Sequence, residues 1–329
     1  MKKYLVFIIL LCLFVSGANA QDRQKLAQAG FKFLNYSSAD PKSAALGEAV
    51  TSLEGGATSL FYNPAGVARQ ENMIDLYAGQ SDWIADINYM FAAASFSPFG
   101  GNYGVFGVTF SSVDYGDFIG TRIVAGGYED VGTFSPKALS VGIGYAKALS
   151  DKFSVGGNIK YVKQSLGNHN IAAGQDGKDY DLDVAAFDFG VIYKTGFKSL
   201  NFGMNVRNFS QEIEYVDESF QLPLTFKIGL SMNLIDLTKI DPKMHSFILS
   251  VDANKPRDFK EQISIGGEYT FFNTLSLRFG YTNPTDEMEY NLGVGLKQSY
   301  AGYTLGLDYA YTAFGVFGNL HRFGINMSL

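Results

Sequence analysis

Alternation of apolar and polar residues runs through most of the chain from residue 73 to residue 329, and it limits the fold more than any other feature. In residues 321–329 (HRFGINMSL), Phe323, Ile325 and Met327 share one face, and the residues between them are polar or small. A period of two over about eight to ten residues predicts a β-strand with one apolar and one polar face. About fourteen such strands are predicted, over residues 73–80, 87–97, 103–114, 139–149, 152–165, 183–194, 199–208, 222–234, 245–253, 262–270, 274–282, 288–297, 301–312 and 321–329.

The connections between these strands alternate in length. Short turns are predicted at residues such as 98–102, 150–151 and 271–273, and longer polar loops at 115–138, 166–182 and 209–221. Bacterial outer-membrane barrels have this arrangement, with short turns at one end and long loops at the other. We therefore predict an all-β fold, a transmembrane antiparallel β-barrel of about fourteen strands. A large soluble sandwich or propeller is the alternative, because alternation alone does not separate the two.

The polar face of the predicted strands carries many charged residues. A soluble sandwich turns its apolar faces inward, whereas a membrane barrel turns its apolar face to lipid and its polar face to the lumen. In a barrel these charges would therefore line the lumen. They are Lys160, Arg207, Lys227, Asp252, Glu268, Arg278, Glu289, Lys297, Asp308 and Arg322.

The first twenty residues, MKKYLVFIILLCLFVSGANA, have the pattern of a secretory signal peptide. Lys2 and Lys3 precede an apolar run that is too short to span a membrane comfortably, and A-N-A at 18–20 predicts cleavage before Gln21. Cys12, the only cysteine, lies inside this segment, so the predicted mature chain has no thiol chemistry and no disulfide. We expect an exported protein of the outer membrane of a Gram-negative cell.

The charge of the chain argues against nucleic acid as a partner. The formal net charge is −6, and no block of basic residues is present. Removal of the leader would make the chain more acidic, because Lys2 and Lys3 are its only charged residues. Proteins that bind nucleic acid usually present a basic surface. The expected surroundings are outer-membrane lipid instead.

Residues 21–72 differ from the rest, because small and apolar residues recur at helical spacings and Gly55-Gly56 and Asn63-Pro64 interrupt them. A barrel of about fourteen strands is too wide for its own side chains to fill. We therefore predict a signal peptide at 1–20, a short helical N-terminal plug segment at 21–72 and the barrel at 73–329.

The N-terminal segment resembles the corresponding part of the PorV/PorQ family of outer-membrane proteins, which is related to the FadL-like barrels. The resemblance rests on residues 45–49 (ALGEA), Glu54 and residues 62–66 (YNPAG), and it extends over the predicted mature chain. It implies a fourteen-stranded barrel with an N-terminal plug. The plug-motif residues that it implies are Gly47, Asn63, Pro64, Ala65 and Gly66.

Possible partner contacts lie in two predicted loops. Acidic and aromatic residues interleave in residues 209–221 (SQEIEYVDESFQL), and Trp83, the only tryptophan, lies in the first loop of the barrel. The first set would suit a protein partner or a solvated loop, and Trp83 would suit an interfacial anchor or a partner contact. The candidate residues are Glu212, Glu214, Tyr215, Phe220 and Trp83.

No sequence motif indicates catalysis, a cofactor or a bound metal. His169, His245 and His321 have no partner at metal-ligand spacing, and G-x-S-x-G, H-E-x-x-H and P-loop patterns are missing. The run from Asp179 to Asp183 begins like a calcium loop, with Asp176 upstream, but it lacks the glycine and glutamate of that motif. An acidic loop is the simpler interpretation, and we expect a protein that is not an enzyme.

Two functions remain open. PorV-like members bind secreted cargo proteins and pass them on in type IX secretion, and PorQ-like members belong to the secretion machinery. This resemblance favours the binding of such proteins on the loops and lumen mouth. The alternative, implied by the FadL-like relatives, is transport of hydrophobic or small solutes across the outer membrane. A continuous apolar path through the lumen would favour transport, and a polar lumen under a wide mouth would favour partner binding.

Overall fold

Fourteen antiparallel strands close into one barrel. The structure, a computed structural model, describes residues 26–36, 39–169, 178–215, 217–285, 288 and 290–329. The predicted signal peptide therefore lies outside the described residues. The barrel strands are β1 (Ile74–Asp82), β2 (Asn88–Phe96), β3 (Val105–Asp114), β6 (Lys137–Ala148), β7 (Phe153–His169), β8 (Lys178–Lys194), β9 (Asn201–Ser210), β12 (Thr225–Asn233), β13 (His245–Pro256), β14 (Gln262–Phe271), β15 (Leu275–Asn283), β16 (Tyr290–Tyr300), β17 (Tyr303–Ala313) and β18 (Asn319–Ser328).

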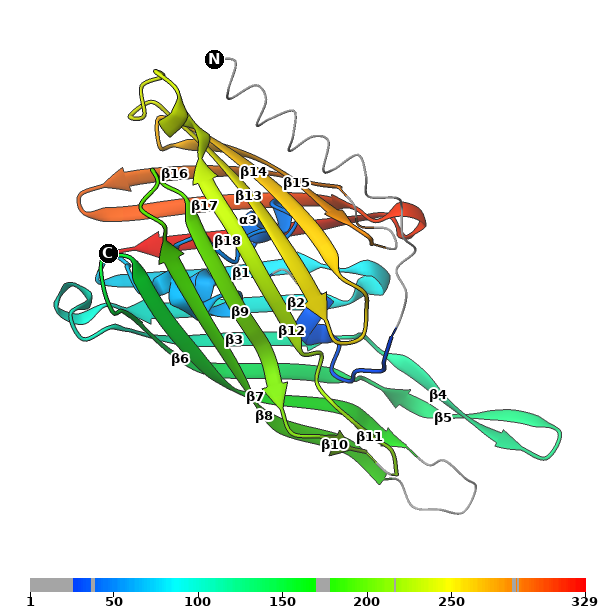
Figure 1. Ribbon diagram of the computed structural model, residues 1–329. Coiled ribbons are helices and arrows are strands. Elements are labelled where there is room, and N and C mark those ends of the chain that lie inside the picture. Colours follow the sequence, from blue (N-terminus) through cyan, green and yellow to red (C-terminus); the bar gives the residue numbers. More distant parts are fainter. Residues whose placement is uncertain (1–25, 37–38, 170–177, 216, 286–287, 289) are drawn as a thin grey trace.

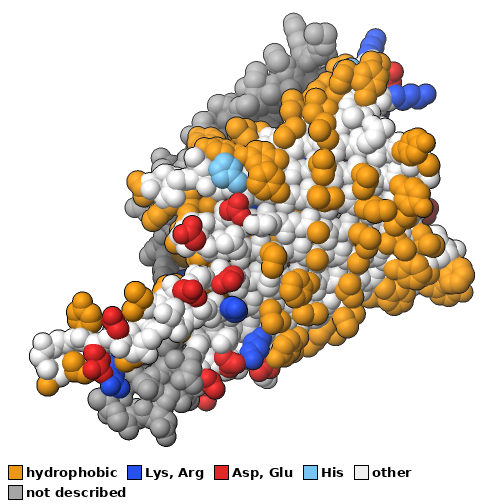
Figure 2. All heavy atoms as spheres, turned by 180° about the vertical axis from the view of Figure 1, so that it is seen from behind, with side chains coloured by type: hydrophobic (Ala, Val, Ile, Leu, Met, Phe, Trp, Pro, Cys, Tyr) orange, Lys and Arg blue, Asp and Glu red, His pale blue; other side chains and the backbone are white. Residues whose placement is uncertain are grey.

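The first and last strands close the sheet. β1 pairs with β2 on one side and with β18 on the other, from Asp75 opposite Ser328 to Asp82 opposite His321 (Figure 1). Along β18 the alternation predicted from the sequence separates the two faces, because Phe323 and Ile325 are exposed and Arg322 is buried. The predicted fourteen-stranded transmembrane barrel is confirmed. Figure 2 shows hydrophobic side chains over the outer face of the strands, and charged side chains gathered toward one end.

The two ends of the barrel differ. We call the end with the connections 97–104, 149–152, 195–200 and 272–274 the turn end, and the opposite end the loop end. At the loop end the hairpin of β4 (Phe118–Val124) and β5 (Gly127–Phe134) projects beyond the barrel (Figure 1). A second, very short hairpin joins β10 (Ile213–Glu214) and β11 (Ser219–Phe220). In an outer-membrane barrel the turn end faces the periplasm and the loop end faces outward.

The structure corrects three predicted loops. Residues 115–138 and 209–221 contain the two hairpins, and much of 166–182 is strand, because β7 reaches His169 and β8 begins at Lys178. Beyond the lipid a strand needs no apolar face, and its backbone ladder is sufficient to hold it. Alternation therefore disappears from the sequence in these segments although the strands continue.

The N-terminal segment lies inside the barrel. It contains short helices, and among the described residues no helix is long and apolar enough to cross a membrane. Asp40 begins α3 by accepting a hydrogen bond from the Ser43 amide at 2.8 Å, and Pro41 takes the first helical position. The helices are α2 (Phe33–Tyr36), α3 (Pro41–Ala45), η1 (Ala57–Phe61) and η2 (Pro64–Val67), with η3 (Ile84–Asp86), η4 (Pro98–Gly101), η5 (Leu234–Leu237) and η6 (Gly315–Phe317) in the barrel connections.

Glycines on the inner wall admit the segment. A Cβ added at Gly190 would lie 1.9 Å from Asn63 Oδ1, and one added at Gly280 would lie 2.1 Å from the Gly47 nitrogen. Both distances are too short for any side chain, because the Asn63 side chain touches the wall at Gly190 and the backbone of the segment touches it at Gly280. The close approach explains why two inward positions on strands β8 and β15 carry no side chain.

Candidate functional site

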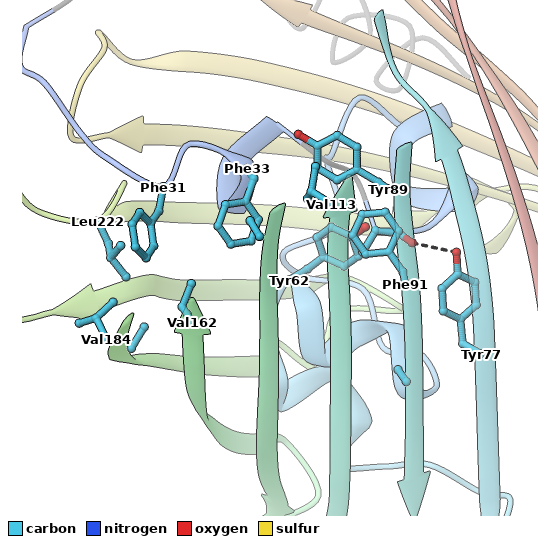
Figure 3. Close-up of a cluster of buried hydrophobic side chains, with 14 of the residues drawn as sticks. Phe31, Phe33, Tyr62, Tyr77, Tyr89, Phe91, Val113, Val162, Val184 and Leu222 are labelled. Carbon is cyan, nitrogen blue, oxygen red and sulfur yellow. Dashed lines mark hydrogen bonds between the residues drawn. The ribbon is translucent and has the colours of Figure 1, made fainter. Parts of the chain in front are cut away.

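The lumen has an apolar half and a charged half. Inward side chains of β1, β2, β3, β6, β7 and β8 form one aromatic-rich cluster with residues of the N-terminal segment (Figure 3). Phe61 of η1 packs edge-on against Phe91 of β2, with ring centroids 6.0 Å apart. This contact explains why residues 87–97 are apolar on both faces. The cluster includes Phe31, Phe33, Tyr62, Tyr77, Tyr89, Phe91, Val113, Val162, Val184 and Leu222.

The charged half is formed by β12 to β18, and β7, β8 and β9 add the largely buried charges Lys160, Asp188 and Arg207. Most of the residues predicted to line the lumen are buried or half-buried there and on neighbouring strands, whereas Lys297 is exposed and Glu289 lies outside the described residues. The polar-lumen prediction therefore describes half of the wall. The apolar half was not predicted from the sequence. The one indication of it was β2, whose residues are apolar on both faces and therefore indicate an apolar inner wall at that strand.

A chain of charges crosses this half at the turn end. Lys42 of α3 lies 3.0 Å from Glu268, and Glu268 also accepts a hydrogen bond from Arg278 Nε at 2.5 Å. Arg278 reaches across β16 to Asp308, 2.5 Å away. Gly295 permits this, because a Cβ there would lie 2.5 Å from the Asp308 carboxylate. The network joins the N-terminal segment to three strands of the wall.

Helix α3 and the turn after it separate two cavities. The turn-end cavity, of about 580 Å³, is lined by Asp40, Lys42 and Ser43 on the side of the segment. The loop-end cavity, of about 420 Å³, is lined by Ala44, Gly47 and Glu48. No residue lines both cavities, and many residues from Val50 to Asn72 line the turn-end cavity alone. The stretch from Asp40 to Glu48 contributes side chains to both cavity walls, and we call it the partition.

Two buried groups hold the partition. Asp40 accepts hydrogen bonds from the Ser43 amide and, at 3.3 Å, from the Tyr62 hydroxyl. Burial is the largest influence on Asp40 and raises the pKa of this carboxyl from 3.8 to about 6. On the other side of α3, Glu48 lies 3.0 Å from Lys227 of β12.

The plug-motif residues implied by the family resemblance all touch the wall or one another. The Asn63 side chain donates hydrogen bonds to the carbonyls of Thr51, at 2.6 Å, and Val191 of β8, at 3.1 Å. Its Oδ1 accepts from the Ala65 amide, which caps η2. Pro64 and Ala65 lie against Gly156, and Gly66 donates its amide to Asn63. Gly47 has a φ of 61° and accepts a hydrogen bond from Thr282.

The structure separates the two parts of the suggested partner-binding set. Trp83 lines the loop-end cavity, where its ring packs on Tyr89 and Phe314 at 5.8 Å each. The Arg322 guanidinium lies 5.7 Å from the centre of the Trp83 ring. Trp83 therefore faces the lumen and contributes to a cavity wall.

The residues of the loop 209–221 lie elsewhere at the loop end. Tyr215 and Phe220 stack with centroids 5.7 Å apart, and both rings pack on Phe31 of the N-terminal segment. The Gln221 side chain donates a hydrogen bond to Glu212 at 2.6 Å, and Glu214 is exposed. The aromatic side chains of this loop are thus engaged by the chain itself.

The aspartates that suggested a calcium loop lie on a strand. Asp179, Asp181 and Asp183 are exposed on one face of β8, and Asp181 forms an ion pair with Lys163 at 2.9 Å, while Asp176 lies outside the described residues. Within the part of the chain that the structure describes, no group of three or more His, Cys, Asp or Glu residues is arranged to hold a metal.

Comparison with known proteins identifies the class of fold. No family model and no curated sequence matches the chain. Three solved structures match most of it: the Ralstonia pickettii toluene transporter TbuX (TM-score 0.55, 12% identity, 89% of this chain and 98% of that chain), the Pseudomonas putida toluene transporter TodX (0.55, 12%, 87% and 96%) and a Pseudomonas aeruginosa FadL homologue (0.54, 10%, 88% and 97%). The fold is therefore that of FadL-like outer-membrane barrels.

Proposed function

We propose that this protein is an outer-membrane channel for small molecules with an apolar part, and that its N-terminal segment is a plug that closes it. The observation that carries the proposal is the partition: two cavities inside one barrel are separated by α3 and the turn after it. Displacement of about ten residues would join them. Solved barrels of the same fold include transporters of toluene, which agrees with passage of apolar solutes.

The two halves of the lumen would act differently. A solute entering from the loop end would meet the aromatic side chains that line the loop-end cavity, Trp83, Phe314 and Phe317. The charged half would hold the plug, because Lys42, Glu48 and Thr51 bind Glu268, Lys227 and Asp252 there. Ion pairs and hydrogen bonds can exchange for water when the plug moves, so the closed state is reversible.

The test is to lock the plug to the wall. The predicted mature chain has no cysteine, so Lys42→Cys and Glu268→Cys introduce the only two thiols, and a short, reducible bis-thiosulfonate reagent can join them. We expect cells that express the linked protein to take up isotopically labelled toluene no faster than cells without it, and reduction to restore uptake.

The matched control places both thiols on the wall, at Glu268→Cys and Arg278→Cys. Treatment with the same reagent leaves the plug free, so uptake should continue. Equal uptake by the linked and the reduced Lys42→Cys/Glu268→Cys protein would refute a moving plug.

A second candidate function, binding of a secreted cargo protein or of a secretion-machinery component, is favoured by the β4–β5 hairpin. Ile119, Ile123 and Tyr128 of this hairpin are 72%, 89% and 75% exposed. They extend from the loop end, and exposed apolar side chains in such a place are typical of protein contacts.

The hairpin can be tested by crosslinking. We expect the full chain to co-purify with a protein partner from its native outer membrane, and a variant with residues 117–135 replaced by a short glycine linker to lose that partner while keeping its barrel. Recovery of the same proteins by both forms would exclude the hairpin as the docking surface.

A further inference from the structure

Five residues that line the loop-end cavity each carry a buried polar atom with no hydrogen-bond partner among the described residues. Two of these atoms are donors, two are acceptors, and the fifth is a hydroxyl that can do either. Nearly all buried polar atoms in folded proteins are paired, so a group of unpaired ones around one cavity indicates a place where a bound molecule completes the bonds. The atoms are Arg207 Nε, Arg322 Nε, Asn254 Oδ1, Asp258 Oδ1 and Thr285 Oγ1.

Arg322 is the strongest donor. Its side chain is 4% exposed, and Nη1 donates one hydrogen bond to Thr312 at 2.7 Å. Glu48 lies near enough to interact with its charge, but within the described residues no carboxylate forms a direct ion pair with it, and Nε has no hydrogen-bond partner. A buried cation without a direct carboxylate partner is costly, and a guanidinium edge fits a carboxylate well. This corner of the cavity therefore favours an anionic group.

The other three atoms lie at the loop end of the barrel, on strand β13, in the connection after it and in the connection after β15. Asn254 donates to Gln262 at 3.1 Å, and Gln262 donates to the carbonyl of Pro284 at 2.7 Å, next to Thr285. Asp258, in the loop between β13 and β14, is only 2% exposed. Its unpaired carboxylate oxygen makes this side of the cavity favourable to a cationic donor.

The remaining charges of the cavity are accounted for. Lys227 and Glu48 neutralise each other at 3.0 Å, and Lys32 is partly exposed. Arg207 already donates to the Phe61 carbonyl at 2.9 Å through Nη1. Arg207 and Arg322 thus both keep an unpaired Nε, and Asp258 keeps an unpaired carboxylate oxygen; Arg322 is the arginine that lies beside the Trp83 ring.

The rest of the cavity wall is aromatic. Trp83, Phe314 and Phe317 line it on the side of Arg322, and Phe314 packs on both of the other rings. Such a wall favours a flat or apolar body beside the charged groups. A volume of about 420 Å³ is in the range of small-molecule sites.

We propose that the loop-end cavity binds a small zwitterion with an apolar body, with its carboxylate on Arg322, its ammonium group toward Asp258 and its body against Trp83, Phe314 and Phe317. The inference rests on the proposed channel function and names its solute class. A dipeptide with one aromatic side chain is the simplest molecule of this kind, because a flexible body joins its two charges.

The experiment uses the full chain in detergent and follows the emission of Trp83, which is the only tryptophan and lines the cavity. Four ligands share one body: alanyl-phenylalanine, its N-acetyl form, its C-terminal amide and the form with both ends blocked. We expect saturable binding of the free dipeptide, with each singly blocked form about tenfold weaker and the doubly blocked form weakest.

Two variants assign the ends. Arg322→Gln should weaken binding of the free dipeptide about tenfold and leave binding of the C-terminal amide unchanged. Asp258→Asn should also weaken binding of the free dipeptide about tenfold, and it should leave binding of the N-acetyl form unchanged. Because Arg322 lies beside Trp83, its replacement can change the Trp83 emission itself. Binding to both variants is therefore also measured by calorimetric titration, which does not depend on that emission. Arg122→Gln, on the β4–β5 hairpin, is the control and should bind all four ligands as the parent does.

Equal binding of all four ligands, or binding of none of them, would overturn the inference. Binding of only the carboxylate-bearing forms, whatever their amino end, would also overturn it and leave an anion site. These failures are distinct from failure of the channel proposal, because uptake of toluene by the plug-locked and reduced proteins is measured separately.

Discussion

Glu48 and Lys227 form an ion pair of 3.0 Å between the N-terminal segment and strand β12, 179 residues apart in sequence. The Lys227 side chain is 5% exposed and that of Glu48 is 26% exposed. The pair therefore fastens the plug to the wall from inside the barrel, next to the partition formed by α3.

Breaking this pair should loosen the plug. Glu48→Gln removes the direct partner of the buried Lys227 ammonium, and only Asp252 then remains near its charge. Because Asp252 remains and Glu48 is partly exposed, the cost should be below the roughly 3 kcal/mol of a fully buried pair. The expected result is faster proteolysis and faster hydrogen exchange in residues 39–68, with the barrel intact. The double variant Glu48→Gln/Lys227→Met should lose less stability than the two single variants lose together. An additive loss of stability would show that the pair is not coupled.

A side chain at residue 190 should displace the plug motif. The Cβ of Gly190→Ala would lie 1.9 Å from Asn63 Oδ1, so the hydrogen bond from Asn63 to Val191 must break. We expect a conducting or leaky barrel in planar bilayer recordings. Gly157→Ala is the matched control on β7, because its nearest contact would be 3.5 Å away. Equal conductance of the two variants would contradict this role of Asn63.

The seating of the plug should depend on pH through Asp40. Burial raises the pKa of this carboxyl to about 6 in the seated plug, above its ordinary value of 3.8. The seated state therefore binds the proton more tightly, and the plug becomes more stable as the pH falls through about 6 and less stable above it. This difference in the pKa of Asp40 corresponds to about 3 kcal/mol in the stability of the seated plug.

Hydrogen exchange of residues 39–68, measured from about pH 4.5 to 7.5 and corrected for intrinsic rates, tests this pH dependence. Asp40→Asn keeps a side chain that caps α3 and removes the titration, so its plug should be equally stable across the range. The same pH dependence in Asp40→Asn as in the parent would assign it to another group.

The N-terminal end of the segment should depend on one aromatic ring. Phe31 packs on Tyr215 and Phe220, and Gly30 donates its amide to the Gln221 carbonyl at 3.1 Å. Phe31→Ala removes a buried ring, which costs about 3 to 5 kcal/mol in a protein core.

We expect Phe31→Ala to increase hydrogen exchange in residues 26–33 and 213–222 together, with strands β13 to β18 unchanged. Phe317→Ala, at the opposite side of the loop end, is the comparison and should leave both segments protected. Unchanged exchange in residues 213–222 of Phe31→Ala would mean that the loop holds its shape without the N-terminal segment.

The sequence by itself determined the strands and the class of fold. A period of two is a local property, readable from residues such as Phe323 and Ile325, and short and long connections follow from the same segments. The charged inner positions, Arg278 and Asp308 among them, were readable for the same reason. The role of Asn63 as a plug-motif residue stays a prediction from the sequence.

Only the tertiary structure decided what those residues meet. The partners of Arg322 and Trp83 depend on which strands surround the same cavity once the barrel closes. They also depend on where the plug lies inside the barrel. Such contacts join segments more than a hundred residues apart, and no local pattern encodes them. The apolar half of the lumen is an example, because Phe31 packs there on Tyr215, which lies 184 residues further along the chain.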